Sequence, residues 1–266
     1  MPFGVLSRLI LSSVWRQARG KSTRQPVSRR VDLGPLRQIP GAIVDGSTGD
    51  PACDHINRLD EDVALIENLG VGAYRFSVSW PRFMPDGRGA ISADGAGFYD
   101  RLIDGLLERG VQPSMTCYHW DLPQVLQDKG GWLNPDMGRW FADYAHALGE
   151  RYGDRVSMVA TLNEPWVSAY LGYAAGVHAP GEVKSAHALE VAYRLMVASG
   201  LGIRALRDAG VTNPGLVLNL TTVRLDQPGA EAAREHIDLL HNVFFTDLLA
   251  GRGVPEKLMA NTEAIT

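Results

Sequence analysis

The segment "VSMVATLNEPW", residues 156–166, joins an apolar run to polar residues. The run contains no Gly or Pro, which is typical of a buried strand. An amide, a carboxylate and a proline follow it as Asn163, Glu164 and Pro165. The proline ends the strand, because it has no N–H to donate to a neighbouring strand. We therefore expect this strand to deliver Asn163 and Glu164 to a site at its carboxyl end.

The rest of the chain repeats this unit from residue 57 onward. Strand patterns occupy residues 73–80, 112–120, 156–164 and 215–220. Helical periodicity occupies residues 57–69, about 98–107, 137–152, 186–208 and 229–251. The alternation in "AYRFSVSW" puts Tyr74, Phe76, Val78 and Trp80 on one face. The apolar stripes of the first two helices include Leu69 and Leu107. Strand followed by helix, four times, predicts a parallel α/β sheet built from βαβ units.

Polar and aromatic residues gather at one place in each unit. They are Trp80 and Arg82 after the first strand, His119, Trp120 and Asp121 after the second, Asn163 and Glu164 after the third, and Asn219 at the end of the fourth. All of these positions are carboxyl ends of strands. In parallel α/β proteins, and above all in (β/α)8 barrels, this is the face on which sites are built.

Composition favours small-molecule chemistry. The chain has 266 residues, 45% hydrophobic and 21% charged, with a formal net charge of -4. This charge gives no reason to expect nucleic acid or an anionic membrane as a partner. No apolar run is long enough to span a membrane. Cys53 and Cys117 belong to no CxxC pattern, so we expect free thiols in a reducing compartment, hence a cytoplasmic protein.

Glu164 is the first candidate catalytic residue. A carboxylate at a strand end can be a surface charge, a helix cap, an ion-pair partner or a general acid. Asn163, Trp120 and Trp166 favour the last role. An amide can hydrogen-bond a sugar hydroxyl, and apolar rings raise the pKa of a nearby carboxyl by desolvation. This is the equipment of an acid that protonates a glycosidic oxygen.

Three other residue types allow more than one interpretation. His119 in "YHWD" is a metal ligand, a structural histidine or a group that binds a sugar hydroxyl; we prefer the last, because no second ligand lies at metal-binding spacing. Trp120 and Trp166 are either core residues or flat surfaces for a pyranose ring. Arg75 is half of a buried ion pair, or it holds a catalytic carboxylate ionised.

Three long stretches together resemble one family. They are "PGAIVDGSTGDPACDHINRLDEDVALIENLGVGAYRFSVSWPRFMPDG" (40–87), "YHWDLPQVLQDKGGWLN" (118–134) and "TLNEPWVSAYLGYAAGVHAPG" (161–181). They closely resemble the family one glycoside hydrolases, the β-glucosidase family of retaining (β/α)8-barrel enzymes. The resemblance implies hydrolysis of O-glycosidic bonds in a small β-glycoside or oligosaccharide, with no cofactor and no metal.

The resemblance also implies a role for each candidate residue. Glu164 matches the general acid/base and Asn163 the residue that binds the 2-hydroxyl of the sugar. The remaining matches are His119 and Trp120 for sugar binding, Trp166 and Asn219 for the aglycone side, and Arg75 for contact with the nucleophile. The nucleophile's own "TENG" type motif is not found. Glu263 in "NTEAIT" is rejected for that role, because Ala and Ile follow it.

We therefore expect a partial barrel over residues 40–266, with strands resembling the second to fifth of eight. Such a chain carries the acid/base half of a β-glucosidase-like site. The alternative is a truncated, catalytically inactive fragment or a sugar-binding remnant. A third possibility is a companion chain that supplies a complementing C-terminal half-barrel.

Residues 1–39 form an atypical basic segment that we expect to lie outside the fold. Seven Lys or Arg residues precede the first acidic one, Asp32, as in a transit peptide. We prefer a reading-frame shift as its origin. Codons for "VDLGPL" (31–36), read one base later, can give Ser-Ile-Trp-Asp-Leu, which resembles the family's "PSIWD" segment.

Overall fold

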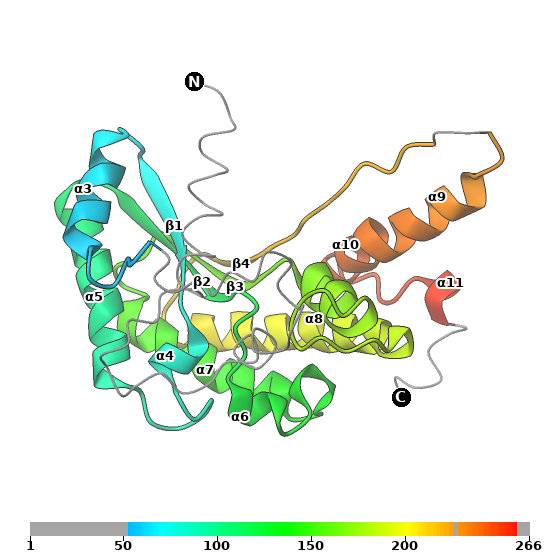
Figure 1. The fold of residues 1–266 in the computed structure, drawn as a ribbon, viewed down its shortest axis with the longest axis horizontal. Coiled ribbons are helices and arrows are strands. Elements are labelled where there is room, and N and C mark those ends of the chain that lie inside the picture. The colour runs from blue at the N-terminus through cyan, green and yellow to red at the C-terminus, as the bar shows by residue number, and fades with distance from the viewer. Residues whose placement is uncertain (1–52, 226–227, 260–266) are drawn as a thin grey trace.

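The computed structural model describes residues 53–225 and 228–259 and contains one parallel sheet (Figure 1). Its strands are β1 (Ala73–Ser77), β2 (Gln112–Tyr118), β3 (Met158–Asn163) and β4 (Pro214–Val217). They pair in the order β1-β2-β3-β4, so each strand lies beside the next one in the sequence. The predicted four-stranded parallel sheet is confirmed.

Helices follow each strand and are arranged around the sheet in Figure 1. The α-helices are α3 (Leu59–Asn68), α4 (Trp80–Phe83), α5 (Ala93–Glu108), α6 (Gln124–Gln127), α7 (Met137–Tyr152), α8 (Ser185–Asp208), α9 (Glu231–Asp238), α10 (Phe244–Leu249) and α11 (Glu256–Met259). A 3-10 turn, η1 (Gly131–Leu133), precedes α7, and two π-helical segments are η2 (Val167–Ala174) and η3 (Leu239–Val243). This succession of strands and helices is the partial (β/α)8 barrel expected from the sequence.

The core lies between the sheet and the helices and is rich in aromatic rings. Trp80 stacks on Tyr144 with 4.4 Å between ring centroids and an angle of 3° between the planes. The Tyr144 hydroxyl donates to the Cys117 carbonyl over 2.9 Å. Both rings are fully buried. This contact fixes α7 against β2, the strand that leads to His119.

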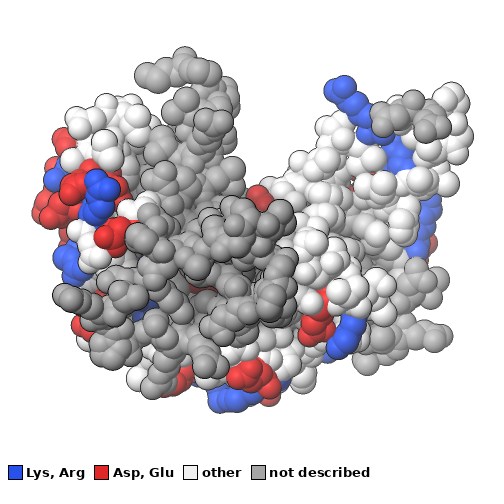
Figure 2. All heavy atoms as spheres, viewed as in Figure 1, with Lys and Arg blue, Asp and Glu red and all other residues white. Residues whose placement is uncertain are grey.

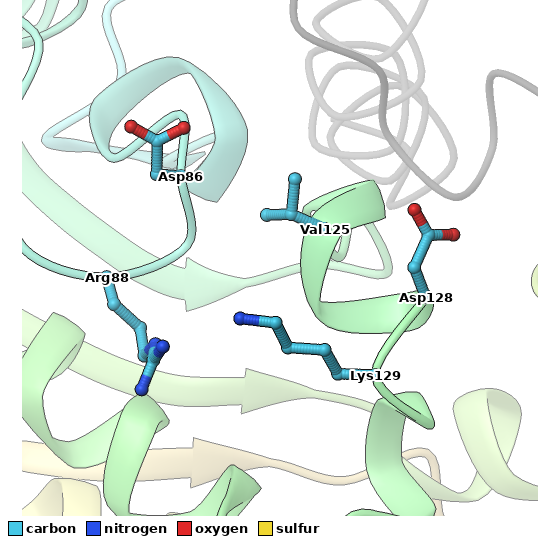
Figure 3. A pocket seen from close by; sticks show the side chains of 5 residues that line it. All are labelled: Asp86, Arg88, Val125, Asp128 and Lys129. Carbon is cyan, nitrogen blue, oxygen red and sulfur yellow. The ribbon is translucent and has the colours of Figure 1, made fainter.

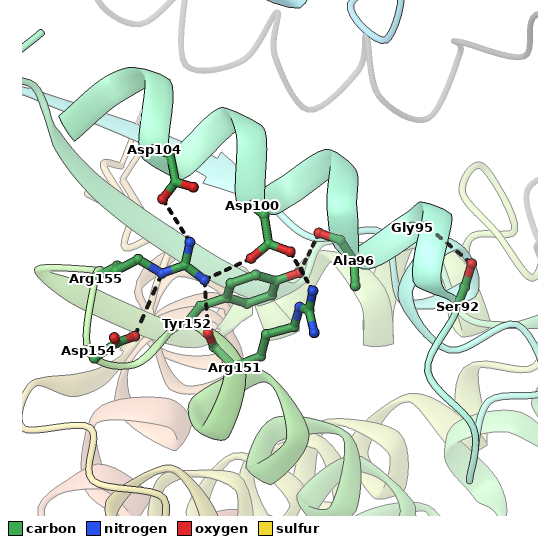
Figure 4. A network of polar contacts seen from close by, with 9 residues as sticks. All are labelled: Ser92, Gly95, Ala96, Asp100, Asp104, Arg151, Tyr152, Asp154 and Arg155. Carbon is green, nitrogen blue, oxygen red and sulfur yellow. Dashed lines mark hydrogen bonds and ion pairs between the residues drawn. The ribbon is translucent and has the colours of Figure 1, made fainter. Parts of the chain in front are cut away.

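An ion-pair network joins α5 to the end of α7 (Figure 4). Asp100 on α5 accepts from both Arg151 and Arg155, and Arg155 also donates to Asp104 over 2.8 Å. The arginines hold the pKa of the Asp100 carboxyl below its usual value, although burial opposes them. The Tyr152 hydroxyl donates to the Ala96 carbonyl within the same network. Neighbouring outer helices are thereby fastened to each other.

Three predicted details of the first two units are wrong. The first strand ends at Ser77, and Trp80 instead begins α4, where its indole N–H donates to the Gly87 carbonyl. Leu69 and Leu107 are each 41% exposed. Both leucines lie where their helices end and the chain turns through an exposed glycine, so they leave the buried stripe.

Candidate active site

The structure brings residues from three strands together at Asn163, the last residue of β3. Arg75 in β1 donates from Nη2 to the Asn163 side-chain oxygen over 2.8 Å. Trp120, which follows β2, donates from its indole Nε1 to the Asn163 backbone carbonyl over 2.9 Å. Asn163 itself is 2% exposed. Trp120 and Asn163, which were both predicted at the carboxyl ends of strands, are therefore in contact, and Arg75 reaches Asn163 from within β1.

Glu164 is held by its backbone. Its N–H donates to the Val217 carbonyl of β4, and its own carbonyl accepts from Val167, each over 2.9 Å. Its φ is 49°, in the left-handed region that residues with a side chain seldom adopt. β3 therefore ends at Asn163, one residue earlier than the sequence predicted, although the Glu164 N–H still bonds to β4. The carboxyl therefore leaves the sheet at a fixed place.

Burial sets the protonation of the Glu164 carboxyl. The side chain is half-buried, and desolvation raises its pKa above the ordinary glutamate value. The positive charge of Arg75 acts in the opposite direction but does not cancel this effect. The pKa of Arg75 is in turn lowered by its own burial. A carboxyl in such surroundings keeps its proton to a higher pH than an exposed one.

His119 is a neutral, buried hydrogen-bonding group. Its Nδ1 lies 3.0 Å from the Ser77 hydroxyl, and the residue is 7% exposed. Burial, and next the charge of Arg75, lower the pKa of His119 to about 3. One ring nitrogen therefore donates and the other accepts at neutral pH. In the part of the chain that the structure describes, no three His, Cys, Asp or Glu side chains gather as metal ligands.

Trp120 has a constrained backbone and aromatic neighbours. Its φ is 73°. The His119 ring lies edge-on at 4.8 Å and the His178 ring edge-on at 5.3 Å, measured between centroids. His178 was not among the predicted site residues. It follows η2, where the sequence shows no periodic pattern that could have indicated it.

Asp121, three residues after the end of β2, carries a buried carboxyl. It is 8% exposed, and burial raises its pKa to about 7. The polar neighbours Ser79 and the His119 backbone, together with the charge of Arg82, oppose that rise. Asp121 is thus a buried carboxyl beside His119 and Trp120, and its Oδ1 has no hydrogen-bond partner among the described residues.

A second group of rings begins at Trp166, two residues after Glu164. Trp166 stacks on Tyr170 at 5.4 Å and on His241 at 4.2 Å between centroids. The His241 Nε2 lies 2.8 Å from the Asn219 carbonyl oxygen. The sequence prediction missed both Tyr170 and His241. The spacing of four residues between Trp166 and Tyr170 was an available signal, whereas nothing in the sequence near His241 was one.

Asn219 belongs to this second group and not to a strand. The sequence predicted that Asn219 would end a strand over residues 215–220, but β4 ends at Val217. The chain leaves the ladder there because the Asn219 carbonyl accepts from a side chain on η3. Asn219 is thus brought to Trp166 through His241, and among the described residues it makes no hydrogen bond to Arg75, Asn163 or His119.

A separate hollow of about 470 Å³ lies between the segment after α4 and helix α6 (Figure 3). It is lined by Asp86, Arg88, Val125, Asp128 and Lys129. The Arg88 guanidinium lies over the Trp140 ring, 4.7 Å from its centroid. The predicted site residues are not among those that line this hollow. Its mixed charges match the wider surface, since acidic and basic side chains lie near each other on the periphery of the face in Figure 2.

Two of the predictions concern residues outside the described ranges. The basic segment 1–39 and Glu263 both lie outside the described residues. Among the described helices, none combines the length and the apolar character that crossing a bilayer requires.

The parallel sheet, its surrounding helices and the half-buried carboxyl beside an amide and aromatic rings define a barrel protein of the glycoside hydrolase class. The chain belongs to glycosyl hydrolase family 1, whose family model matches residues 32–264.

Curated relatives of the chain are β-glucosidases. It is 50% identical to β-glucosidase A of Thermotoga maritima over 169 residues, which are 64% of this chain and 38% of that protein. It is 46% identical to thermostable β-glucosidase B of Thermobispora bispora over 221 residues, 83% of this chain and 46% of that protein. The chain thus spans less than half the length of these relatives.

Solved structures show the same relationship. A β-glucosidase from Thermotoga maritima in complex with castanospermine superposes with a TM-score of 0.84 at 39% identity, covering 89% of this chain and 55% of that one. The AHE enzyme from Alicyclobacillus herbarius gives a TM-score of 0.84 at 39% identity, covering 90% and 54%. The fold described above is therefore part of the barrel of these proteins.

Proposed function

We propose that this chain carries the acid/base half of a retaining β-glucosidase-like site, with Glu164 as the general acid/base. The observation that carries the proposal is the half-buried Glu164 carboxyl, whose pKa is raised and whose backbone is fixed at the end of β3. An acid with a raised pKa keeps the proton that a departing glycosidic oxygen must receive. The named β-glucosidases among its relatives support the same activity.

The neighbouring side chains fit the binding of a β-glycoside. The Asn163 oxygen accepts from Arg75, so its amide nitrogen is the group that donates to a sugar 2-hydroxyl. His119 is neutral, and because its Nδ1 is engaged by the Ser77 hydroxyl, its Nε2 is the ring nitrogen left for the glycone, beside the ring of Trp120. Trp166 and Asn219 form the wall on the leaving-group side. The castanospermine complex of a Thermotoga maritima relative supports a sugar-sized ligand.

The chemical step assigns one proton to Glu164. As the bond between the anomeric carbon and the glycosidic oxygen breaks, the carboxyl gives its proton to that oxygen and becomes a carboxylate. A retaining enzyme needs a second carboxylate about 5 to 5.5 Å away, which attacks the anomeric carbon. We assign Arg75 to the support of that carboxylate. Its guanidinium is held in place by the hydrogen bond from Nη2 to Asn163, and its positive charge acts on the neighbouring Glu164 carboxyl.

A second candidate function is sugar binding without turnover. Among the described residues, the influences on the Glu164 pKa are burial and Arg75, and no carboxylate is one of them. A companion chain with a complementing half-barrel would supply the second carboxylate.

Cys53 and Cys117 are free thiols, which supports a reducing compartment such as the cytoplasm.

Calorimetric binding of castanospermine and hydrolysis of aryl β-glucosides test these proposals on the 266-residue chain. Binding with turnover supports the hydrolase, binding without turnover supports the second candidate, and the absence of both contradicts the two. Where turnover is present, Glu164→Gln should lower it by roughly 10²- to 10⁴-fold for poor leaving groups and far less for good ones, and azide should restore the second step.

The matched control is Glu150→Gln, which makes the same change on the exposed face of α7. It should leave binding and turnover unchanged. Equal loss on good and poor leaving groups in Glu164→Gln would assign Glu164 a structural role.

A further inference from the structure

His241 lies in the π-helical segment η3, which separates α9 from α10. Its ring stacks on Trp166 with 4.2 Å between centroids and 26° between the planes. Trp166 is also stacked on Tyr170, with 23° between the planes. The Trp166 ring therefore belongs to a set of three nearly parallel rings contributed by η3, η2 and the segment that follows Glu164.

Hydrogen bonds fix the orientation of the His241 ring. Its Nε2 lies 2.8 Å from the Asn219 carbonyl oxygen and 3.2 Å from the Thr221 hydroxyl. A carbonyl oxygen only accepts, so Nε2 must carry the hydrogen. The imidazole therefore donates a hydrogen bond to the residues that follow β4, and it cannot rotate without breaking that bond.

The neighbouring residue of η3 secures the same segment. Asn242 accepts from the Thr221 N–H over 2.9 Å and donates to the Thr221 carbonyl over 2.7 Å. Two consecutive side chains of a π-helical segment therefore hold residues 219–221. Such π-helical turns occur frequently at functional sites, where they re-aim side chains. Here the turn aims an imidazole at the aromatic ring next to the candidate acid.

We propose that His241 is a positioning residue that sets the orientation of the Trp166 ring and thereby the preference for groups on the leaving-group side. The inference deepens the proposed function and rests on it. The Trp166 ring is already fixed in position and orientation, so it loses little conformational freedom when a ligand binds. Its orientation then decides which aglycones stack well on it. The sugar-binding residues His119, Trp120 and Asn163 make their contacts to other strands, so they should not respond.

Two substitutions separate the two features of His241. His241→Gln keeps a side-chain N–H donor for Asn219 but removes the ring, and His241→Phe keeps a ring but removes the donor. His146→Ala on α7, where the side chain is 41% exposed, is the control. The ligands are castanospermine, which is sugar-sized, and an aryl β-glucoside, which also reaches the leaving-group side.

His241→Gln should raise the Kd of the aryl glucoside about two- to twelvefold, the range that aromatic pairs give, and that of castanospermine less than twofold. His241→Phe should fall between wild type and His241→Gln. Loss of affinity for both ligands alike would overturn the proposal, as would unchanged affinity for both in His241→Gln. The control should match wild type.

A spectroscopic measurement keeps this inference separate from the proposed function. The contribution of Trp166 to near-UV circular dichroism is the difference between wild type and Trp166→Phe. It should shrink in His241→Gln at an unchanged melting temperature. If wild type binds neither ligand, the proposed function fails while this measurement still judges the positioning role. An unchanged Trp166 contribution in His241→Gln would refute it.

Discussion

Two glycines in α8 allow a sharp test of how this helix is packed against β3. Gly202 is buried, and a Cβ added there would lie 2.7 Å from Cε1 of Phe141 and 3.3 Å from Cγ2 of Thr161. Phe141 and Thr161 are themselves fully buried, so neither can move into solvent. Gly200 lies two residues earlier on the exposed side, and a Cβ there would meet nothing within 4 Å.

The same substitution should therefore stabilise the protein at Gly200 and be neutral to destabilising at Gly202. Gly200→Ala should stabilise the protein by about 1 kcal/mol, because alanine is the better helix former. Gly202→Ala gains the same term but adds overpacking, which costs about 1–3 kcal/mol. The helix-propensity term is common to both variants. Their difference in unfolding free energy, about 1–3 kcal/mol, measures the packing of α8 alone.

Urea unfolding of the two variants and wild type at one pH measures this difference. In melting temperature, each kcal/mol corresponds to roughly 2–4 °C for a chain of this size. Thr161 lies two residues before Asn163 in β3, so Gly202→Ala should also weaken castanospermine binding, whereas Gly200→Ala should not. Equal stability of the two variants would show that α8 does not approach β3 as described, and the reasoning would fail.

Three further changes have expected outcomes. The NMR signals of His119 should not titrate between pH 5 and 8, because folding lowers its pKa to about 3. The contribution of His119 to the free energy of unfolding should therefore fall as the pH drops from 6.5 towards 3. A titration midpoint near pH 6.5 in the folded protein would contradict the burial of His119. Arg155→Ala removes ion pairs between the end of α7 and α5 and should lower the free energy of unfolding in urea by about 1–2 kcal/mol. Arg139→Ala removes an exposed pair and should change it by no more than about 0.5 kcal/mol. Equal losses in the two variants would mean that the network adds no more stability than an exposed pair. Iodoacetamide should label the half-buried Cys53 in the native protein but spare Cys117, whose thiol pKa is raised by complete burial, until urea unfolds the chain; rapid native labelling of Cys117 would contradict the core.

The sequence predicted the order of elements well because hydrophobic periodicity is strongest where an element is buried along its length. The helix predicted over residues 137–152 has those bounds in the structure, with Phe141, Tyr144 and Leu148 on its buried face. Strand ends were predicted less well. The strands stop one to three residues before the apolar pattern does, because the chain turns away to form the site at Ser77 and Val217.

The sequence predicted the residues of the candidate site that lie in or beside strands, but not those that come from η3. Asn163, His119 and Arg75 come from strands whose register brings them together, so their neighbourhood follows from the sheet. His241 comes from a π-helical segment inside a stretch that the sequence predicted as one helix, residues 229–251. Its contact with Trp166 depends on tertiary structure between segments 75 residues apart in number, which no local pattern encodes.

The backbone at Trp120 and Glu164 bears on how variants of this protein should be selected. Their φ values of 73° and 49° lie in the left-handed region, which glycine and asparagine adopt readily. Other residues there are strained by about 1–3 kcal/mol each. A screen that ranks variants only by heat resistance or expression will therefore enrich glycine or asparagine at both positions and discard the indole and the carboxyl. Libraries meant to improve robustness should keep these two codons constant, or pair every round with a sugar-binding selection.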